Sequence, residues 1–404
     1  MAMFSHLPLY AGDPILSLQQ AYLAEPRADK VNLGIGAYQD ENGAIPTLRS
    51  VAAVRPVLAA DLGPTPYQPI AGSKQYRDLV TELVLGSDRY RKVGERTVAI
   101  QSLGGSGALR VGCDLLKRYF PDSQVFISAP SWPNHQAIFE AAGFKVGSYR
   151  YFDATTNGVD FDGMLADLQA MPARSIVILH PACHNPTGAD LTRDQWDAVI
   201  KVIAGRNLLP FLDMAYQGFA EGIDEDGYAV HAMVDAGISL LLSVSFSKTF
   251  SLYGERCGAL VGVSADADEA KRLLSQMEMS IRANYSSPPT FGGKIIARVL
   301  ADAALRQDWM DEVGEMRTRM LRMRDRLHAG MKARAPSLNV DYLLSQRGMF
   351  SYTGLSAAQV ERLRVEHGIY AVNSGRICVS GLRDDNVDRV AAAFAEVMHD
   401  PGQD

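Results

Sequence analysis

A lysine directly after a buried apolar strand is the residue with the clearest capacity for chemistry. Lys248 follows the apolar run Leu240–Phe246, whereas the other nine lysines lie in helical patterns or beside turns. A lysine at such a partly desolvated position can have a lowered pKa and act as an amine nucleophile that forms Schiff bases. Ser245, Ser247 and Arg256 lie on either side of it and are suitable donors to a phosphate.

A glycine-rich segment, QSLGGSGALR, ends another apolar run and opens a helical pattern. Its glycines let the backbone approach a ligand closely, and the first N–H groups of a helix bind phosphate well. Ser106 adds a hydroxyl next to Gly105. The segment does not match the dinucleotide fingerprint, because Arg110 stands where the third glycine belongs. Taken alone, it also fits a tight turn without a ligand.

Two further apolar runs end in polar side chains. Asn185 follows the run that begins at Ile178, and its amide can donate to a ligand oxygen. His180, Cys183 and His184 precede it, but three ligands crowded into one loop without a fourth do not suit zinc, so we expect no metal. Asp213 ends the run Pro210–Leu212, where it is either a helix N-cap or a buried carboxylate that needs a partner.

These side chains require a scaffold that brings strand ends together. Short apolar runs alternate with helical patterns from about residue 97, which predicts an α/β fold with a mostly parallel sheet covered on both faces. Ligands collect at the carboxyl ends of the strands in such sheets. The predicted strands are Thr97–Gln101, Gln124–Ser128, Ser175–His180, Pro210–Leu212, Leu240–Phe246 and Ala259–Val263. The predicted helices between them include Ala108–Tyr119, Pro133–Ala142 and Thr192–Ala204.

The chain after residue 264 reads as long helices followed by a smaller α+β region. Trp309–Ala333 carries methionines and Leu327 at helical spacing, and its run of arginines is interpreted as a solvated face balanced by preceding acidic residues. Strands at Gly348–Tyr352 and Ile377–Ser380 and a helix at Asp385–Met398 complete this region, joined by Val31–Ile35. We expect an N-terminal arm (1–10), a small domain (11–44 and 315–404) and a large domain (45–314).

Composition narrows the functional classes. The 404 residues carry a net charge of −6, which gives no general electrostatic reason to bind nucleic acid or a membrane surface. No signal peptide or membrane span is recognised, and four widely spaced cysteines fit free thiols better than disulfides, so we expect a cytoplasmic protein. A phosphate site, an amine and a buried carboxylate together match the needs of pyridoxal phosphate.

Motifs along the whole chain then point to a family. NLGIGAYQDENG, LGGSGALR, SWPNH, HNPTG, DMAYQGF, SFSKTFSLYGER, IRANYSSPP, GMFSYTG and NSGR occur in the order seen in class I aminotransferases. The chain resembles the aspartate and aromatic amino acid subgroup of the pyridoxal-phosphate fold-type I enzymes, and most of all the bacterial aromatic-amino-acid (tyrosine) aminotransferases. Ser106 stands where a threonine is often found, which keeps the hydroxyl.

The resemblance implies a role for each matching residue. Lys248 would bond the cofactor aldehyde and then move a proton. Asp213, supported by His135, would pair with the ring nitrogen, and Trp132 would stack on the ring. The remaining cofactor contacts implied are Asn185 and Tyr216 on the ring oxygen, and Gly105, Ser106, Ser245, Arg256 and the partner subunit's Tyr67 on the phosphate. Arg376 would bind the substrate α-carboxylate, Arg282 from the partner would bind a side-chain carboxylate, and Gly36 would lie on the strand that closes over the substrate.

The expected protein is therefore a homodimer with shared active sites. Seen singly, Trp132 would be a core residue, Tyr67 a turn aromatic, and both arginines surface residues. Two carboxylate-binding arginines favour transamination over decarboxylation or β-elimination. We expect transfer of the amino group from tyrosine, phenylalanine, aspartate or glutamate to 2-oxoglutarate. The alternatives are a strict aspartate aminotransferase and, more remotely, a nicotinamide-dependent oxidoreductase or a cofactor-free binding protein.

Overall fold

A seven-stranded sheet forms the centre of the molecule. The computed structural model describes residues 2–9, 12–61 and 63–399, and its main sheet has the order β2-β10-β9-β8-β7-β3-β4. Its strands are β2 (Thr97–Leu103), β3 (Val125–Ala129), β4 (Val146–Arg150), β7 (Ile176–Leu179), β8 (Leu209–Met214), β9 (Leu240–Ser245) and β10 (Cys257–Val263). The strand β10 runs in the opposite direction to the other six strands of this sheet. The predicted α/β class and mostly parallel sheet are thus confirmed. The strand β4 was not predicted, because its residues VGSYR are not a continuous apolar run and only Tyr149 among them is buried.

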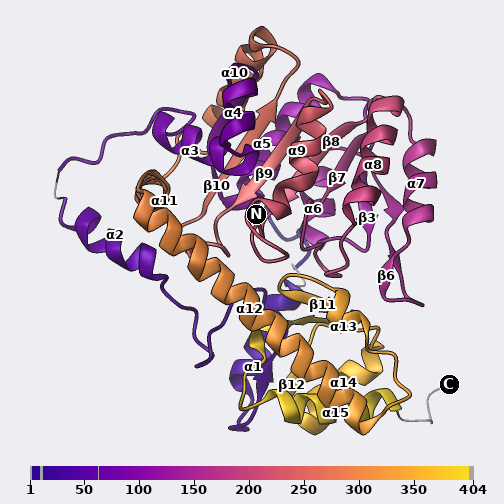
Figure 1. Ribbon diagram of the computed structural model, residues 1–404. Helices are drawn as coiled ribbons and strands as arrows, with labels where there is room; N and C mark the ends of the chain where they lie inside the picture. Colours follow the sequence, from indigo (N-terminus) through magenta and orange to yellow (C-terminus); the bar gives the residue numbers. More distant parts are fainter. Residues whose placement is uncertain (1, 10–11, 62, 400–404) are drawn as a thin grey trace.

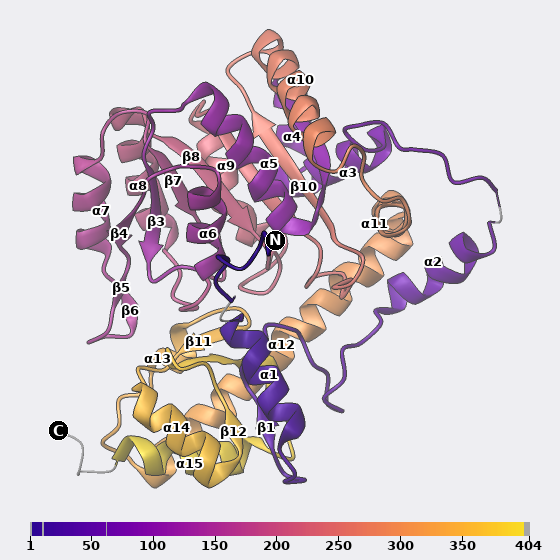
Figure 2. The same ribbon diagram turned by 180° about the vertical axis from the view of Figure 1, so that it is seen from behind.

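Helices cover both faces of this sheet (Figures 1 and 2). Successive strand residues enter opposite cores: Phe211 and Leu241 pack on one side, and Leu212 and Leu242 on the other. This alternation explains the continuous apolar runs, because a strand buried on both faces has no solvent side. The first core contains residues of α5 (Gly104–Tyr119), α6 (Pro133–Ala141) and α10 (Ala267–Asn284). The opposite core contains residues of α2 (Arg49–Ala59), α3 (Lys74–Leu85), α7 (Phe161–Ala170), α8 (Arg193–Arg206), α9 (Tyr228–Asp235) and α11 (Phe291–Ala301).

Short elements complete this part of the chain. They are α4 (Ser87–Val93), the 3₁₀ turns η1 (Gly94–Arg96) and η2 (Glu225–Gly227), and a two-stranded pair of β5 (Phe152–Asp153) and β6 (Gly158–Val159).

The long helix α12 (Ala303–Arg334) belongs to two cores. Trp309 and Met316 are buried in a core of the large sheet, whereas Met323 and Leu327 belong to a separate apolar cluster built from both ends of the chain. Figure 1 shows α12 extending from the large sheet to the C-terminal elements. Those elements and their N-terminal neighbours are α1 (Pro14–Ala24), β1 (Val31–Asn32), α13 (Tyr342–Ser345), β11 (Phe350–Tyr352), α14 (Ala357–His367), β12 (Ile369–Tyr370), β13 (Arg376–Cys378), η3 (Val379–Gly381) and α15 (Val387–His399). β1 pairs with β12 in parallel, and β11 pairs with β13 antiparallel.

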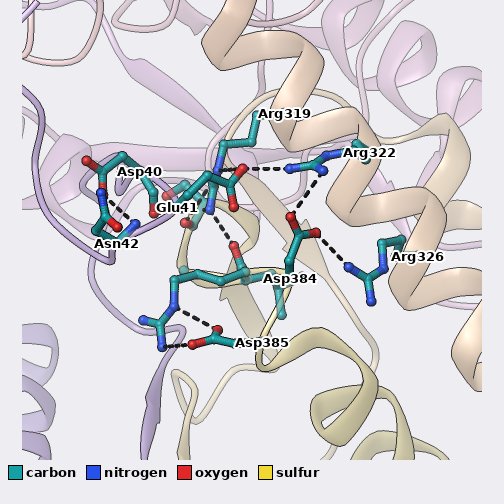
Figure 3. Close-up of polar contacts among 12 residues, drawn as sticks. Asp40, Glu41, Asn42, Arg319, Arg322, Arg326, Asp384 and Asp385 are labelled. Atoms are coloured by element: carbon teal, nitrogen blue, oxygen red, sulfur yellow. Dashed lines mark hydrogen bonds and ion pairs between the residues drawn. The ribbon is translucent and has the colours of Figure 1, made fainter.

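The interpretation of the α12 arginines as a solvated face is wrong for two of them. Arg319 and Arg324 are buried, because α12 packs between the cores and the guanidinium groups reach backbone carbonyls. Arg319 also pairs with Glu41, and Figure 3 shows how that carboxylate is shared with Arg322. The acidic residues that balance the exposed arginines are therefore on distant segments and not on the preceding turn of the helix.

The division into domains at residues 44 and 314 stays a prediction. Residues 1, 10, 11 and 400–404, which belong to the predicted arm and small domain, lie outside the described residues. Among the helices that the structure describes, none combines the length and apolar character needed to cross a membrane.

Candidate active site

The carboxyl ends of β7, β8 and β9 meet at one edge of the sheet because these strands are parallel neighbours. Arg256 comes just before β10, and because β10 is antiparallel its beginning lies at this same edge. A cavity of about 270 Å³ opens here. It is lined by Ile15, Gly36, Gly105, Ser106, Trp132, His180, Asn185, Asp213, Ala215, Tyr216, Ser245, Ser247, Lys248, Arg256, Phe350 and Arg376. Eleven residues predicted to touch cofactor or substrate are thus brought together.

Asp213 is the one carboxylate among the described residues that line the cavity. It lies within β8 near its carboxyl end and is buried, and its Oδ2 is 3.0 Å from Nε2 of His135 while Ser243 donates to its Oδ1 at 2.9 Å. Burial alone would raise the pKa of Asp213, but the contacts with His135, together with the influence of His180 and Ser243, leave the pKa below its usual value. Asp213 is therefore a carboxylate fixed in its ionised form, and it can pair with a cationic nitrogen of a ligand ring.

Lys248 follows β9 and faces the same cavity. Burial lowers the pKa of Lys248 to about 8, although Asp213 acts in the opposite direction. Its Nζ lies 5.5 Å from the centre of the Tyr216 ring. A lysine with this pKa has an appreciable neutral fraction near neutral pH, which is what an amine nucleophile or a proton acceptor needs.

The N-terminus of α5 forms a cradle for an anion. Gly104 has φ of +67°, which strains any other residue, and a Cβ built there would lie 2.6 Å from a guanidinium nitrogen of Arg256 and would displace it. Arg256 donates to Ser247 Oγ at 3.3 Å, and a Cβ on Gly105 would lie 3.1 Å from that of Ser245. Helix N–H groups, serine hydroxyls and a guanidinium converge here, which is a donor set that suits a phosphate.

Asn185 and Tyr216 line the same cavity as Asp213. The Asn185 amide is 3.5 Å from the Tyr216 hydroxyl, and its Oδ1 is buried without a partner among the described residues. Asp190 holds this loop by accepting backbone N–H bonds from Cys183 and His184 at 2.7 and 2.8 Å. The Asn185 side chain is thereby presented to a ligand by a fixed backbone.

Arg376, from β13, contributes a third cationic side chain to the cavity, beside Lys248 and Arg256. Its side chain is buried, donates to the carbonyl of Gly34 at 2.7 Å, and lies 4.4 Å from the centre of the Phe350 ring. Its Nε has no hydrogen-bond partner in the described part of the chain. A buried guanidinium with a free donor and no paired acid is suited to a carboxylate from a ligand.

Two predicted residues lie away from this cavity. Tyr67 is 93% exposed, and Arg282 is exposed near the end of α10, where it bonds Ser286. Both were assigned to the cavity of a partner subunit, and that assignment stays a prediction. Trp132 lines the cavity, with its ring centre 5.3 Å from that of His135.

The sequence did not mark Ile15, Ala215 and Phe350 as cavity residues, and it marked His180 only as a metal ligand that was judged unsuitable. The place of His180 in the cavity could have been found, because it directly follows β7 at the ligand edge. Burial and the neighbouring His135 lower the pKa of His180 to about 3, so it is neutral. Phe350 arrives from a distant strand and carries no chemical group that would have drawn attention.

The lysine, the held carboxylate and the anion cradle at one sheet edge together fit pyridoxal phosphate. The comparisons with known proteins agree. Residues 28–394 match the family model for aminotransferase class I and II, and the chain belongs to this family. The resemblance predicted from the motifs is thus confirmed.

Known relatives match over nearly the whole chain. The aromatic-amino-acid aminotransferase of Escherichia coli is 55% identical, with 98% of this chain and 100% of the relative covered. The aspartate aminotransferase of Pseudomonas aeruginosa is 48% identical, with the same two shares covered. The crystal structure of the aromatic-amino-acid aminotransferase of Burkholderia pseudomallei, covalently bound to pyridoxal phosphate, matches with a TM-score of 0.96 at 50% identity and covers 98% of this chain and 100% of that one.

Proposed function

We propose that this protein is an aromatic-amino-acid aminotransferase that also accepts aspartate and glutamate and uses 2-oxoglutarate as the amino acceptor. One observation carries this function: Lys248 at the sheet edge lines the same cavity as Arg376, a buried guanidinium that has no acidic partner among the described residues. An amine facing a carboxylate-binding guanidinium is the arrangement needed to act at the α-carbon of an amino acid. The relatives named as aromatic-amino-acid and aspartate aminotransferases support both substrate classes.

The residues divide the work between holding and proton transfer. When bound, pyridoxal phosphate supplies an aldehyde that condenses with amines and a ring that delocalises the electron pair left at the α-carbon. Gly105, Ser106, Ser245 and Arg256 would hold its phosphate, and Asp213 would keep the ring nitrogen protonated. Asn185 and Tyr216 would donate to the ring oxygen. Arg376 would fix the α-carboxylate, which orients the α-hydrogen toward Lys248 Nζ for proton transfer.

Two measurements test the cofactor and the substrate class. The purified protein should show the absorbance band of bound pyridoxal phosphate, and that band should change in Lys248→Ala. The absence of any such band in the native protein would remove the enzyme function and favour a cofactor-free binding protein. Values of kcat/KM for phenylalanine and for aspartate then decide the specificity: activity with aspartate alone would identify a strict aspartate aminotransferase.

The proposed active enzyme is a homodimer with shared sites. Tyr67 and Arg282 lie outside the cavity of their own chain, and Phe4 and Leu9 of the N-terminal segment are strongly exposed. Large exposed apolar side chains gathered in one segment are typical of a surface that a partner covers. Mixing inactive Lys248→Ala with Arg282→Ala subunits should restore activity toward aspartate, because hybrid dimers contain one complete site. No recovery after subunit exchange, or an active monomer by gel filtration, would contradict shared sites.

A cytoplasmic location is part of the same proposal. All four cysteines are free and buried, which is typical of proteins of reducing compartments.

A further inference from the structure

Arg324 is a fully buried guanidinium that the proposed reaction does not use. It lies on α12, is 1% exposed, and has no carboxylate partner among the described residues. Burying an arginine without an acid is costly unless its donors are satisfied. Its Nη1 and Nη2 atoms have acceptors, whereas its Nε has no partner in the described part of the chain, so the acceptors of the two Nη atoms indicate what it holds.

All the acceptors of Arg324 belong to one short stretch of chain. Its Nη2 donates to the carbonyls of Gly348 at 2.9 Å and Phe350 at 2.6 Å, and its Nη1 donates to Ser351 Oγ. A longer contact of 3.5 Å reaches the carbonyl of Leu343. A planar guanidinium serves such a set in one fixed orientation, which a lysine ammonium does not reproduce.

The same stretch also contacts the loop that follows β7 of the large sheet. The backbone N–H of Arg347 donates to the Gly188 carbonyl at 2.7 Å, and a Cβ on Gly188 would lie 2.3 Å from the Phe350 oxygen. The carbonyl of Phe350 is thus held between the loop that carries Asn185 and the guanidinium of Arg324. Its position is determined by both.

The Phe350 ring lines the cavity, so its place there depends on where the Phe350 backbone is held. Its ring centre is 4.4 Å from the Arg376 guanidinium and 5.7 Å from the centre of the Tyr216 ring, at 83° to that ring. It also limits the space above Gly36, where a Cβ would lie 3.1 Å from the ring. The Arg376 guanidinium thus contacts both the Gly34 carbonyl and this ring.

We propose that Arg324 is a positioning residue for substrate binding: it holds the Phe350 backbone so that the Phe350 ring orients the Arg376 guanidinium toward the substrate α-carboxylate. This inference rests on the proposed function, in which Arg376 binds that carboxylate. Arg324 itself touches neither cofactor nor substrate.

The test measures binding of an unreactive carboxylate, 3-phenylpropionate, to the holoenzyme by titration calorimetry. Arg324→Lys and Phe350→Leu should each weaken binding by roughly 10-fold, the size expected from a lost cation–π support and a misaligned fork. The double variant should be no weaker than Phe350→Leu alone, because both changes act through the same ring. Arg326→Lys, the same change at a half-buried position of α12 that does not contact this stretch, should leave the Kd unchanged.

Kinetics separate positioning from a purely structural role. In Arg324→Lys, KM should rise for both the amino acid and the oxo acid, since both carry the carboxylate, whereas kcat should fall less than about twofold. A lower melting temperature with unchanged Kd and KM would overturn the proposal. Equally, a double variant whose loss is the product of the two single losses would overturn the route through Phe350.

Two further variants complete the design. If Arg324→Lys does not fold, Ser351→Ala replaces it, because it keeps Arg324 but removes one of the acceptors that fix its guanidinium, and so loosens the hold on the Phe350 carbonyl. A threefold weaker Kd is expected, and an unchanged Kd overturns the proposal. Arg376→Lys tests the function on which the inference rests. If Arg376→Lys binds 3-phenylpropionate as the native enzyme does, the assignment of the α-carboxylate site fails, whatever Arg324 does.

Discussion

The two sides of the cavity satisfy their charges in different ways. On the strand-end side, Asp213 is paired with His135 and Ser243, and Arg256 lies beside Ser247. On the other side, Arg376 is held by a backbone carbonyl, and so is Arg324, which supports this side without lining the cavity. A carbonyl orients a guanidinium without neutralising it. The first side therefore combines one anion, Asp213, with the cations Lys248 and Arg256, whereas Arg376 on the second side has no acid beside it among the described lining residues and keeps its positive charge for an incoming acid.

Removal of the central amine should have the largest effect. Lys248→Ala should lower kcat by about 10⁴-fold or more, because both the nucleophile and the proton carrier are lost. Single-turnover kinetics with added pyridoxal phosphate measures this. Rescue by an exogenous small amine would attribute the loss to the missing amine, whereas near-native activity without rescue would contradict the role of Lys248.

Arg376→Lys should have the next largest effect and act on the other side of the cavity. Loss of the planar fork should reduce kcat/KM by about 100-fold for every amino acid substrate, since all share the α-carboxylate. Steady-state kinetics with phenylalanine and aspartate checks this. A loss confined to aspartate would instead assign Arg376 to the side-chain carboxylate.

Arg319→Met tests whether a buried arginine that donates to backbone carbonyls contributes to the stability of the second side. Arg319 is 8% exposed and donates to the Leu382 carbonyl at 2.7 Å and to Glu41 at 2.9 Å. Its loss leaves buried acceptors unpaired and should cost about 3 kcal/mol of unfolding free energy. Arg322→Met is the matched control, since it shares Glu41 but is exposed (Figure 3), and should cost below about 1 kcal/mol. Equal losses in urea unfolding would contradict the distinction.

The smallest predicted effect is a pH dependence of the cofactor-free protein. The pKa of Lys248 is about 8 in the folded state and 10.5 when unfolded, so its contribution to stability is full above 10.5 and is lost as pH falls through 8. Between pH 9 and pH 7 this loss amounts to about 1 kcal/mol of unfolding free energy. Denaturant unfolding at pH 9 and at pH 7 gives the change in unfolding free energy of the cofactor-free native protein and of Lys248→Ala. The native protein should lose this amount more than the variant, and equal changes in the two proteins would contradict the lowered pKa.

The difference between the two sides also determines which of these residues could be predicted from the amino-acid sequence. Lys248, Asp213 and the glycines of α5 follow apolar runs directly, so local pattern places them at a sheet edge. Phe350, Arg319 and Arg324 owe their positions to contacts between segments far apart along the chain. The α12 arginines were misread for this reason: charge pattern along one helix does not show which carbonyls lie opposite. Arg376 was predicted only through family motifs, because nothing local distinguishes it from a surface arginine.

The reversed direction of β10 has a consequence for the order of folding. β9 and β10 pair directly after a connection of residues 246–256, which contains both Lys248 and Arg256. Closing so short a loop has a low entropic cost, whereas β2 must join β10 across more than a hundred residues. We therefore expect the amine and one phosphate ligand to reach their relative positions early, before the glycine cradle at the end of β2 is in place.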